Sequence, residues 1–328
     1  MSDEQTTSAA GANGRGGPRA FLQAMRPRHW VKNGFVLAPI LFSGRFREGG
    51  AWGLCALATL AFCVLSSAIY LLNDLCDAQA DRNHPVKRGR PIASGRLSRK
   101  AAAVGAAALL LVGLGLADAV AGILIHANED VYGWAFLAWA GAYVVLNVLY
   151  SFWIKSKSSI DVIFLSLGFV LRAMGGASAI AVPFSPWLVM CTFSLCLFLA
   201  LTKRRSEIVE LPPLQRAAAR PSNAAYGPGE VEHMIAVAAA VALVMYILYC
   251  LSPRTVERFS AHIIWTVPLV TYGLFRYDRL TRQAGQNDPT EVLVRDKVIW
   301  AVLALFVLLV GTLRAYGNQE WARRILDF

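Results

Sequence analysis

Charged side chains are scarce in this chain: Asp, Glu, Lys and Arg together make up only 16% of its 328 residues. Hydrophobic residues make up 56%, and the mean hydropathy is +0.47. Soluble domains typically carry about 25% charged residues, so this composition excludes an ordinary soluble protein. Neither a separate soluble domain nor a repeat of solenoid length is visible in the sequence. We therefore predict a protein that crosses a membrane several times.

Cysteine and histidine are also few, and neither is arranged for chemistry of its own. The six cysteines lack the paired spacing of a zinc site or of a disulfide framework. None of the five histidines pairs with a carboxylate in the order of a catalytic triad. We find no nucleic-acid-binding motif, so we predict no nucleic-acid partner. The net charge of +11 is interpreted as the Lys and Arg excess of cytoplasmic loops.

Apolar segments divide the rest of the chain. Residues 1–20 are rich in Gly, Ser, Thr and Ala and are predicted to be a disordered tail, because they cannot bury a core. Residues 21–328 are predicted to form a single transmembrane domain. The fold class we expect is all-α, a polytopic bundle of nine transmembrane helices. The predicted spans are 34–46, 52–73, 101–125, 132–153, 160–182, 186–202, 231–251, 261–275 and 298–316.

The distribution of cations between these spans predicts the orientation. With the N-terminus inside the cell, 24 of the 32 Lys and Arg residues lie on the cytoplasmic side and seven on the outer side. Arg172 alone lies within a span. Lys and Arg strongly favour cytoplasmic loops. We therefore predict a multi-pass protein of the cell membrane with a cytoplasmic N-terminus.

Three carboxylates directly follow the second span. Asp74, Asp77 and Asp81 are spaced by three and four residues, so on a continuing helix they project from one side, with Asn73 at its edge. Stacked like charges are tolerable if a divalent cation lies between them. Oxygen ligands without Cys or His favour Mg²⁺, which binds one or two carboxylates while substrate phosphates complete its shell. The alternative is that the carboxylates are simply solvated.

A basic run follows the carboxylates on the same predicted face. Lys87, Arg88 and Arg90 would hold the rest of an anionic substrate. The alternative is that these cations only determine topology. The segment from Tyr150 to Asp161 adds two amines and one carboxylate, unless it is only a solvated turn. The candidate substrate-binding residues are Lys32, Tyr70, Lys87, Arg88, Arg90, Tyr150, Lys155, Asp161, Arg172, Lys203 and Arg204.

Arg172 is the one cation predicted inside a span. A guanidinium at this depth costs at least about 2.5–3.5 kcal/mol, and it usually faces a wet cavity that contains an anion. The alternative is a buried structural pair with a carboxylate such as Asp161. The stretch from Arg276 to Lys297 is polar enough to be a lid over the site, or else a solvated loop.

Several motifs together resemble the UbiA superfamily of intramembrane prenyltransferases and, within it, the decaprenyl-phosphate phosphoribosyltransferase branch. The first is Asn73-Asp74-x-x-Asp77-x-x-x-Asp81 after a membrane helix. The others are the segments 26–33 and 81–93, Lys203-Arg204-x-x-Glu207, and Arg276-Tyr277 with Arg295-Asp296. The resemblance implies a nine-helix fold with a cytoplasmic active face, and it makes a homo-oligomer possible.

The resemblance also implies a reaction. The donor would be phosphoribosyl pyrophosphate, the acceptor a polyprenyl (decaprenyl) phosphate, and the product an early precursor of cell-wall arabinan. Departure of diphosphate from ribose builds negative charge, which Mg²⁺ held by Asn73, Asp74, Asp77 and Asp81 would offset, so these carboxylates are the predicted catalytic residues. The lipid phosphate is already an anion, so no strong general base is needed.

Two other functions remain open from the sequence. In aromatic prenyltransferases of the superfamily a second Asp-rich motif is expected, whereas here Asp161 stands alone beside Lys155 and Lys157. This departure favours direct anion binding by amines over a second metal. The first alternative is still a UbiA-type enzyme that uses a prenyl diphosphate and another acceptor. The second alternative is a non-enzymatic lipid-phosphate carrier, which would leave the carboxylates unexplained.

Overall fold

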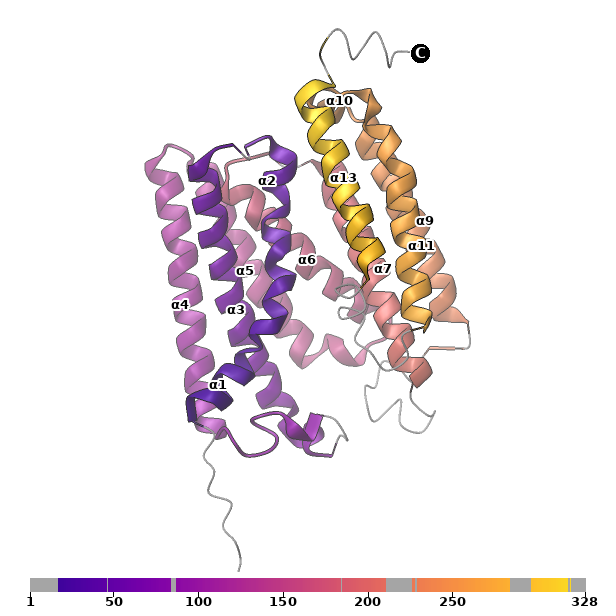
Figure 1. Ribbon diagram of the computed structural model, residues 1–328. Coiled ribbons are helices and arrows are strands. Elements are labelled where there is room, and N and C mark those ends of the chain that lie inside the picture. Colours follow the sequence, from indigo (N-terminus) through magenta and orange to yellow (C-terminus); the bar gives the residue numbers. More distant parts are fainter. Residues whose placement is uncertain are drawn as a thin grey trace, which may run out of the picture.

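The computed structural model describes residues 17–45, 47–83, 87–183, 185–210, 226–227, 229–283, 296–317 and 319, and within these ranges all regular structure is helical (Figure 1). The α-helices are α1 (Gly17–Met25), α2 (Ala38–Ser43), α3 (Gly49–Arg82), α4 (Arg99–His126), α5 (Asp130–Phe152), α6 (Ile160–Ala179), α7 (Pro186–Glu210), α9 (Glu230–Leu251), α10 (Pro253–Phe259), α11 (Val267–Gln283) and α13 (Lys297–Tyr316). Short 3-10 helices are η1 (Pro27–Val36), η2 (Lys87–Gly89), η3 (Ile154–Ser156) and η5 (Ala261–Thr266).

Seven helices of the described part are long and apolar enough to cross a membrane: α3, α4, α5, α6, α7, α9 and α13. The two remaining predicted spans lie on shorter pieces. Span 34–46 falls on the end of η1 and on α2, and span 261–275 falls on η5 and the start of α11. Pro39 and Pro268 stand near the starts of α2 and α11, where proline fits because it needs no amide hydrogen bond. The all-helical membrane fold is confirmed, and the count of nine stays a prediction.

The helices form two groups that meet at α6 and α7 (Figure 1). Helices α1 to α5 lie on one side, and α9 to α13 lie on the other. The helix α1 begins at Gly17, within the predicted tail of residues 1–20, and its Ala20 is buried. The end of α3 lies near α1, whereas α10 and the end of α13 lie at the opposite end of the bundle. The division into one tail and one domain stays a prediction.

Each helix group has its own apolar core. In the first group the rings of Phe136 and Tyr143 pack edge-on against Phe62, at 6.1 and 5.3 Å between centroids. In the second group Phe198, Leu274 and neighbouring side chains of α7, α9 and α11 form a separate cluster. Edge-on aromatic pairs add about 0.5–1.5 kcal/mol beyond the burial of their surface. These cores fix the helix ends that carry the polar side chains described below.

Gly176 allows η1 to lie directly against α6. A Cβ atom at this position would be 2.0 Å from the carbonyl oxygen of Val36. That oxygen belongs to the backbone, so it cannot move aside as a flexible side chain does. The contact fixes the segment that leads from Arg26 into the membrane.

Replacing Gly176 by Ala is expected to lower the free energy of unfolding by about 1–3 kcal/mol, because the added methyl group overpacks this contact. Thermal unfolding of the protein in detergent measures the change. Gly122→Ala is the matched control, since a Cβ there meets nothing within 4 Å. The control should be neutral or stabilising by up to about 1 kcal/mol. Equal stability of the two variants would contradict the close approach.

Candidate active site

Two of the three predicted carboxylates lie together at the end of α3. Arg90 Nη1 donates to Asp74 Oδ1 at 3.2 Å and to Asp81 Oδ2 at 2.7 Å. Both carboxylates are buried, with exposed fractions of 1% and 4%. Their spacing of seven residues, two helical turns, places them on the same side of the helix. Arg90 therefore returns from the following loop to the face that carries these carboxylates.

Asp77 points to a different neighbour. On a regular helix it lies about 60° around the axis from Asp74. Its Oδ1 accepts a hydrogen bond from Lys155 Nζ on η3, and both side chains are partly exposed. This ion pair joins two segments that lie 78 residues apart in the chain. The structure thus brings the predicted amine of the 150–161 segment to the predicted carboxylates.

Arg26 is a second cation on Asp74 that carried no assigned role in the sequence-based prediction. Its Nη2 donates to Asp74 Oδ1, and its guanidinium carbon lies 5.1 Å from the centre of the Tyr70 ring. The residue adopts the left-handed conformation, with φ 55° and ψ 58°, between α1 and η1. The proline that follows Arg26 is the sequence signal for this conformation, because the residue before a proline avoids the right-handed helical region. Arg26, Arg90 and Lys155 together balance the three carboxylates.

Asp161 and Arg204 form a buried ion pair between α6 and α7. Arg204 Nη2 donates to Asp161 Oδ2, and its Nη1 donates to Glu207 Oε2 at 2.5 Å. The side chains of Asp161 and Arg204 are 0% and 2% exposed. Both were predicted to contact substrate. Their burial favours a positioning role, in which the pair holds the start of α6 against the end of α7.

Arg172 is buried among neutral partners. Its guanidinium donates to Asn33 Oδ1 at 2.7 Å, to the Gly168 carbonyl at 2.9 Å and to the Tyr143 hydroxyl at 2.7 Å. It also lies 4.6 Å from the centre of the Tyr143 ring. The alternative pairing with Asp161 is wrong, since the donors of Arg172 bind these three groups and Asp161 is bound by Arg204. Arg172 therefore ties η1, α5 and α6 together and keeps a positive charge that its neutral partners do not offset.

The other predicted residues differ in their exposure. Lys32, Tyr70, Asn73, Lys87, Tyr150 and Lys203 are half-buried, and Arg88 is exposed. Further along, Arg276 binds Asp296 through two hydrogen bonds of 3.0 and 2.8 Å, which join α11 to α13. These hydrogen bonds hold the pKa of Asp296 below its usual range. Most of the predicted lid at 276–297, including Arg295, lies outside the described residues.

A family model described as the UbiA prenyltransferase family matches residues 36–295. The chain belongs to the UbiA prenyltransferase family. The match covers the carboxylates, the basic loop, the 150–161 segment and the end of α7. The resemblance inferred from the motifs is thereby confirmed, together with the multi-pass membrane character.

Two relatives within the UbiA family are similar over nearly the whole chain. A decaprenyl-phosphate phosphoribosyltransferase of Corynebacterium glutamicum is 35% identical over 290 residues, which cover 87% of this chain and 83% of the relative. One of Mycolicibacterium smegmatis is 30% identical over 310 residues, which cover 90% and 91%. Among solved structures, a UbiA homolog from Archaeoglobus fulgidus bound to GPP and Mg²⁺ superposes with a TM-score of 0.68 at 18% identity, over 90% of this chain and 99% of that chain. At this sequence identity, the similarity to the Archaeoglobus fulgidus structure shows the fold alone.

The carboxylate site of this UbiA-family chain offers ligands suited to a magnesium ion. Asp74 Oδ2 is buried and has no hydrogen-bond partner among the described residues. Within the same ranges no three Asp, Glu, His or Cys side chains converge as a complete metal site. Mg²⁺ typically takes one or two carboxylates and fills its shell with water and phosphate oxygens. The free oxygen of Asp74 and the partly exposed Asp77 fit that pattern better than a shell of four protein ligands.

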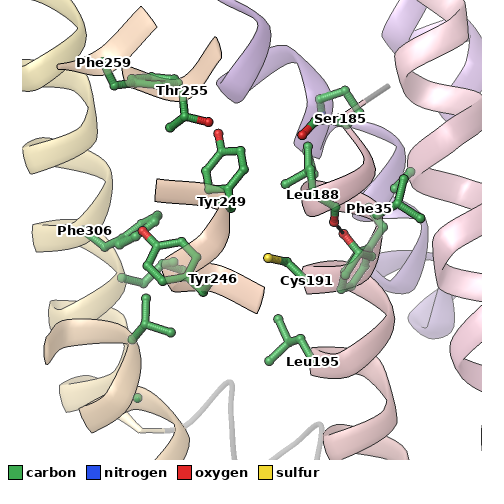
Figure 2. Close-up of a pocket in the computed structure, with 18 of the residues that line it drawn as sticks. Phe35, Ser185, Leu188, Cys191, Leu195, Tyr246, Tyr249, Thr255, Phe259 and Phe306 are labelled. Atoms are coloured by element: carbon green, nitrogen blue, oxygen red, sulfur yellow. Dashed lines mark hydrogen bonds between the residues drawn. The ribbon is translucent and has the colours of Figure 1, made fainter. Parts of the chain in front are cut away.

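An apolar cavity of about 860 Å³ separates the two helix groups of the UbiA fold. Figure 2 shows Tyr246 and Tyr249 of α9 facing Leu188 and Leu195 of α7 across it. The lining of α13 extends from Ile299 to Arg314, which corresponds to about 22 Å along the helix axis. Arg276 and Tyr277 of α11 also line the cavity. The cavity thus offers an apolar lining along much of a helix that is long enough to cross a membrane.

Proposed function

We propose that this protein transfers 5-phosphoribose from phosphoribosyl pyrophosphate to a polyprenyl phosphate, such as decaprenyl phosphate, and releases diphosphate. The observation that carries the proposal is the likeness over most of the chain to relatives named for a decaprenyl-phosphate phosphoribosyltransferase. The site supports it, because one end of the bundle combines carboxylates with an excess of cations. The product would serve as an early precursor of cell-wall arabinan.

The donor's diphosphate belongs at the carboxylates and the basic loop. Asp74 and Asp77 would hold the magnesium ion, with Asn73 and Asp81 beside them. When bound, Mg²⁺ supplies charge stabilisation for the departing diphosphate. Arg90 and the neighbouring Lys87 and Arg88 would bind its oxygens, because an arginine binds phosphate through paired hydrogen bonds. Lys32 and Tyr70 lie on the adjoining segments of η1 and α3.

We expect the ion pairs of the site to rearrange when the anionic donor binds. Lys155 and Arg26 now donate to Asp77 and Asp74. A bound diphosphate offers the same cations more negative charge than one carboxylate does. Their hydrogen bonds then move to phosphate oxygens, where they stabilise the charge that develops as the bond to ribose C1 breaks. The acceptor phosphate attacks C1 from the opposite side, so the configuration at C1 inverts.

The acceptor reaches the site through the apolar cavity. A polyprenyl chain is hydrocarbon, so it suits a lining of Leu, Val, Phe and Tyr side chains. Its phosphate would lie near Tyr150, Arg172 and Lys203, on the elements that border the carboxylate end. No carboxylate in the described part of the chain forms an ion pair with Arg172, which favours an anion nearby. The ion pair of Asp161 and Arg204 would hold the start of α6 against the end of α7 and so position these elements.

We further propose that this end of the bundle faces the cytoplasm. The excess of Lys and Arg on the loops of this side supports the orientation. The helix α1 and the end of α13 lie at opposite ends of the bundle (Figure 1), as an odd number of crossings requires. Phosphoribosyl pyrophosphate would then enter from the cytoplasm.

An assay with purified protein, labelled phosphoribosyl pyrophosphate and decaprenyl phosphate tests the function. We expect a labelled lipid product that requires Mg²⁺ and disappears when a chelator is in excess, because the leaving diphosphate loses its countercharge. Product formed in the presence of chelator would refute the role of the metal. Turnover of a prenyl diphosphate in place of this donor would identify another UbiA-type transferase. Binding of the lipid phosphate without turnover of either donor would identify a carrier.

A further inference from the structure

Charged side chains line the end of the apolar cavity that lies far from the carboxylates. Arg254, Glu257 and Arg258 of α10 and Arg314 of α13 line it there. Figure 1 places α10 and the end of α13 opposite α1. The proposed transfer reaction uses none of these residues. Three guanidinium groups and one carboxylate leave this mouth of the cavity with an excess of positive charge.

Arg314 is held in place at this mouth. Its Nη1 donates to the backbone carbonyl of Arg258 at 2.9 Å. Gly44, which ends α2 with a φ of +79°, lies close to the same guanidinium, because a Cβ there would be 2.7 Å from Nη2. The side chain therefore lies between α2 and α10, at the junction of the two helix groups. Arg254, in the first turn of α10, is exposed and lines the same cavity.

Beneath these cations the cavity is apolar. Figure 2 shows Phe259 near this end and Phe306, Leu188 and Tyr249 further along the wall. The lined stretch of α13, about 22 Å long, is most of the roughly 30 Å thickness of a hydrocarbon core. Cations at the mouth and an apolar wall behind them suit a ligand with an anionic head and a hydrocarbon chain. Guanidinium groups bind phosphate through paired hydrogen bonds.

We propose that this end of the cavity binds an anionic phospholipid from the leaflet opposite the carboxylates, with its phosphate among Arg254, Arg258 and Arg314 and an acyl chain along the cavity. The acceptor lipid is a poorer occupant, because its phosphate must lie at the other membrane face to react. A zwitterionic phospholipid is also poorer, because its head carries a positive charge towards three arginines. Each basic residue near an anionic lipid surface strengthens the attraction between the protein and the lipid.

Native mass spectrometry of the full protein in detergent tests the site. We expect the wild type to retain phosphatidylglycerol in preference to phosphatidylcholine. The variant Arg254→Gln/Arg314→Gln should retain phosphatidylglycerol about thirtyfold more weakly, from the loss of two basic residues. The matched control Arg99→Gln/Lys100→Gln removes two exposed cations from the other end of the bundle. It should retain the lipid as the wild type does.

The single variant Arg254→Glu tests whether misfolding causes the loss of lipid retention. Arg254 is exposed, and the variant keeps the contacts of Arg314, so its unfolding temperature without lipid should match the wild type while its lipid retention falls. Equal retention by wild type and double variant, or equal retention of the two phospholipids, would overturn the proposal. So would displacement of phosphatidylglycerol by inorganic phosphate. A double variant that weakens retention of polyprenyl phosphate as much as retention of phosphatidylglycerol would also overturn it, because the acceptor's phosphate would then lie at these arginines. The measurement needs no turnover, so its outcome is independent of the proposed reaction.

Discussion

Replacing Asp77 by Asn is expected to lower turnover at least about a hundredfold, as losing a group that stabilises developing charge does in other enzymes. The substitution keeps the shape of the side chain and removes its charge. The site then loses a carboxylate for the metal and the countercharge that fixes Lys155. Steady-state turnover with saturating donor and acceptor measures the effect. The Mg²⁺ concentration for half-maximal rate should also rise.

Asp118→Asn is the control for this variant. It makes the same chemical change on α4, where Asp118 is exposed and has no place in the site. Its turnover should match that of the wild type. A wild-type rate for Asp77→Asn would contradict the role of Asp77 as a ligand.

Replacing Arg204 by Gln is expected to lower the free energy of unfolding by about 3–5 kcal/mol, because a buried charge is left without its partner. Asp161 is 0% exposed, so water cannot replace the lost guanidinium. Chemical unfolding in detergent measures the change. Arg282→Gln breaks an ion pair with Asp278 in which Arg282 is 50% exposed, and it should cost less than about 1 kcal/mol.

The double variant Asp161→Asn/Arg204→Gln separates the pair from its members. Removing both charges avoids the isolated buried carboxylate, so part of the lost stability should return. If Arg204→Gln unfolds like Arg282→Gln, the buried pair does not hold α6 against α7. If the double variant loses more free energy of unfolding than the two single variants lose together, the broken ion pair is not the cause of the lost stability.

The sequence predicts local structure here better than it predicts distant contacts. Seven of the nine apolar runs predicted to span the membrane fall on helices of the described part that are long and apolar enough to do so. Helix α3 continues past its span to Arg82, as the carboxylate spacing requires. Asp74 and Asp81 meet at Arg90 because helical periodicity and a short loop decide their positions. Such features depend on neighbours within a few turns. They can therefore be read from one chain.

Other parts of the site depend on packing between distant segments. The contact of Lys155 with Asp77, that of Arg26 with Asp74, and the neutral partners of Arg172 join elements far apart in the chain. Arg204 is as basic and as close to a span as Lys203, yet it is the one buried against Asp161. No local pattern distinguishes such neighbours. The charge of a side chain was predictable, and its partner was not.

In the resting protein each acid at the end of α3 already has a built-in counterion. An incoming bare divalent ion would meet the positive charge of Arg26, Arg90 and Lys155, which already bind one oxygen of each carboxylate. An ion that arrives together with a diphosphate brings negative oxygens to receive the cations it displaces. For the proposed reaction, we therefore expect metal and donor to bind as one unit.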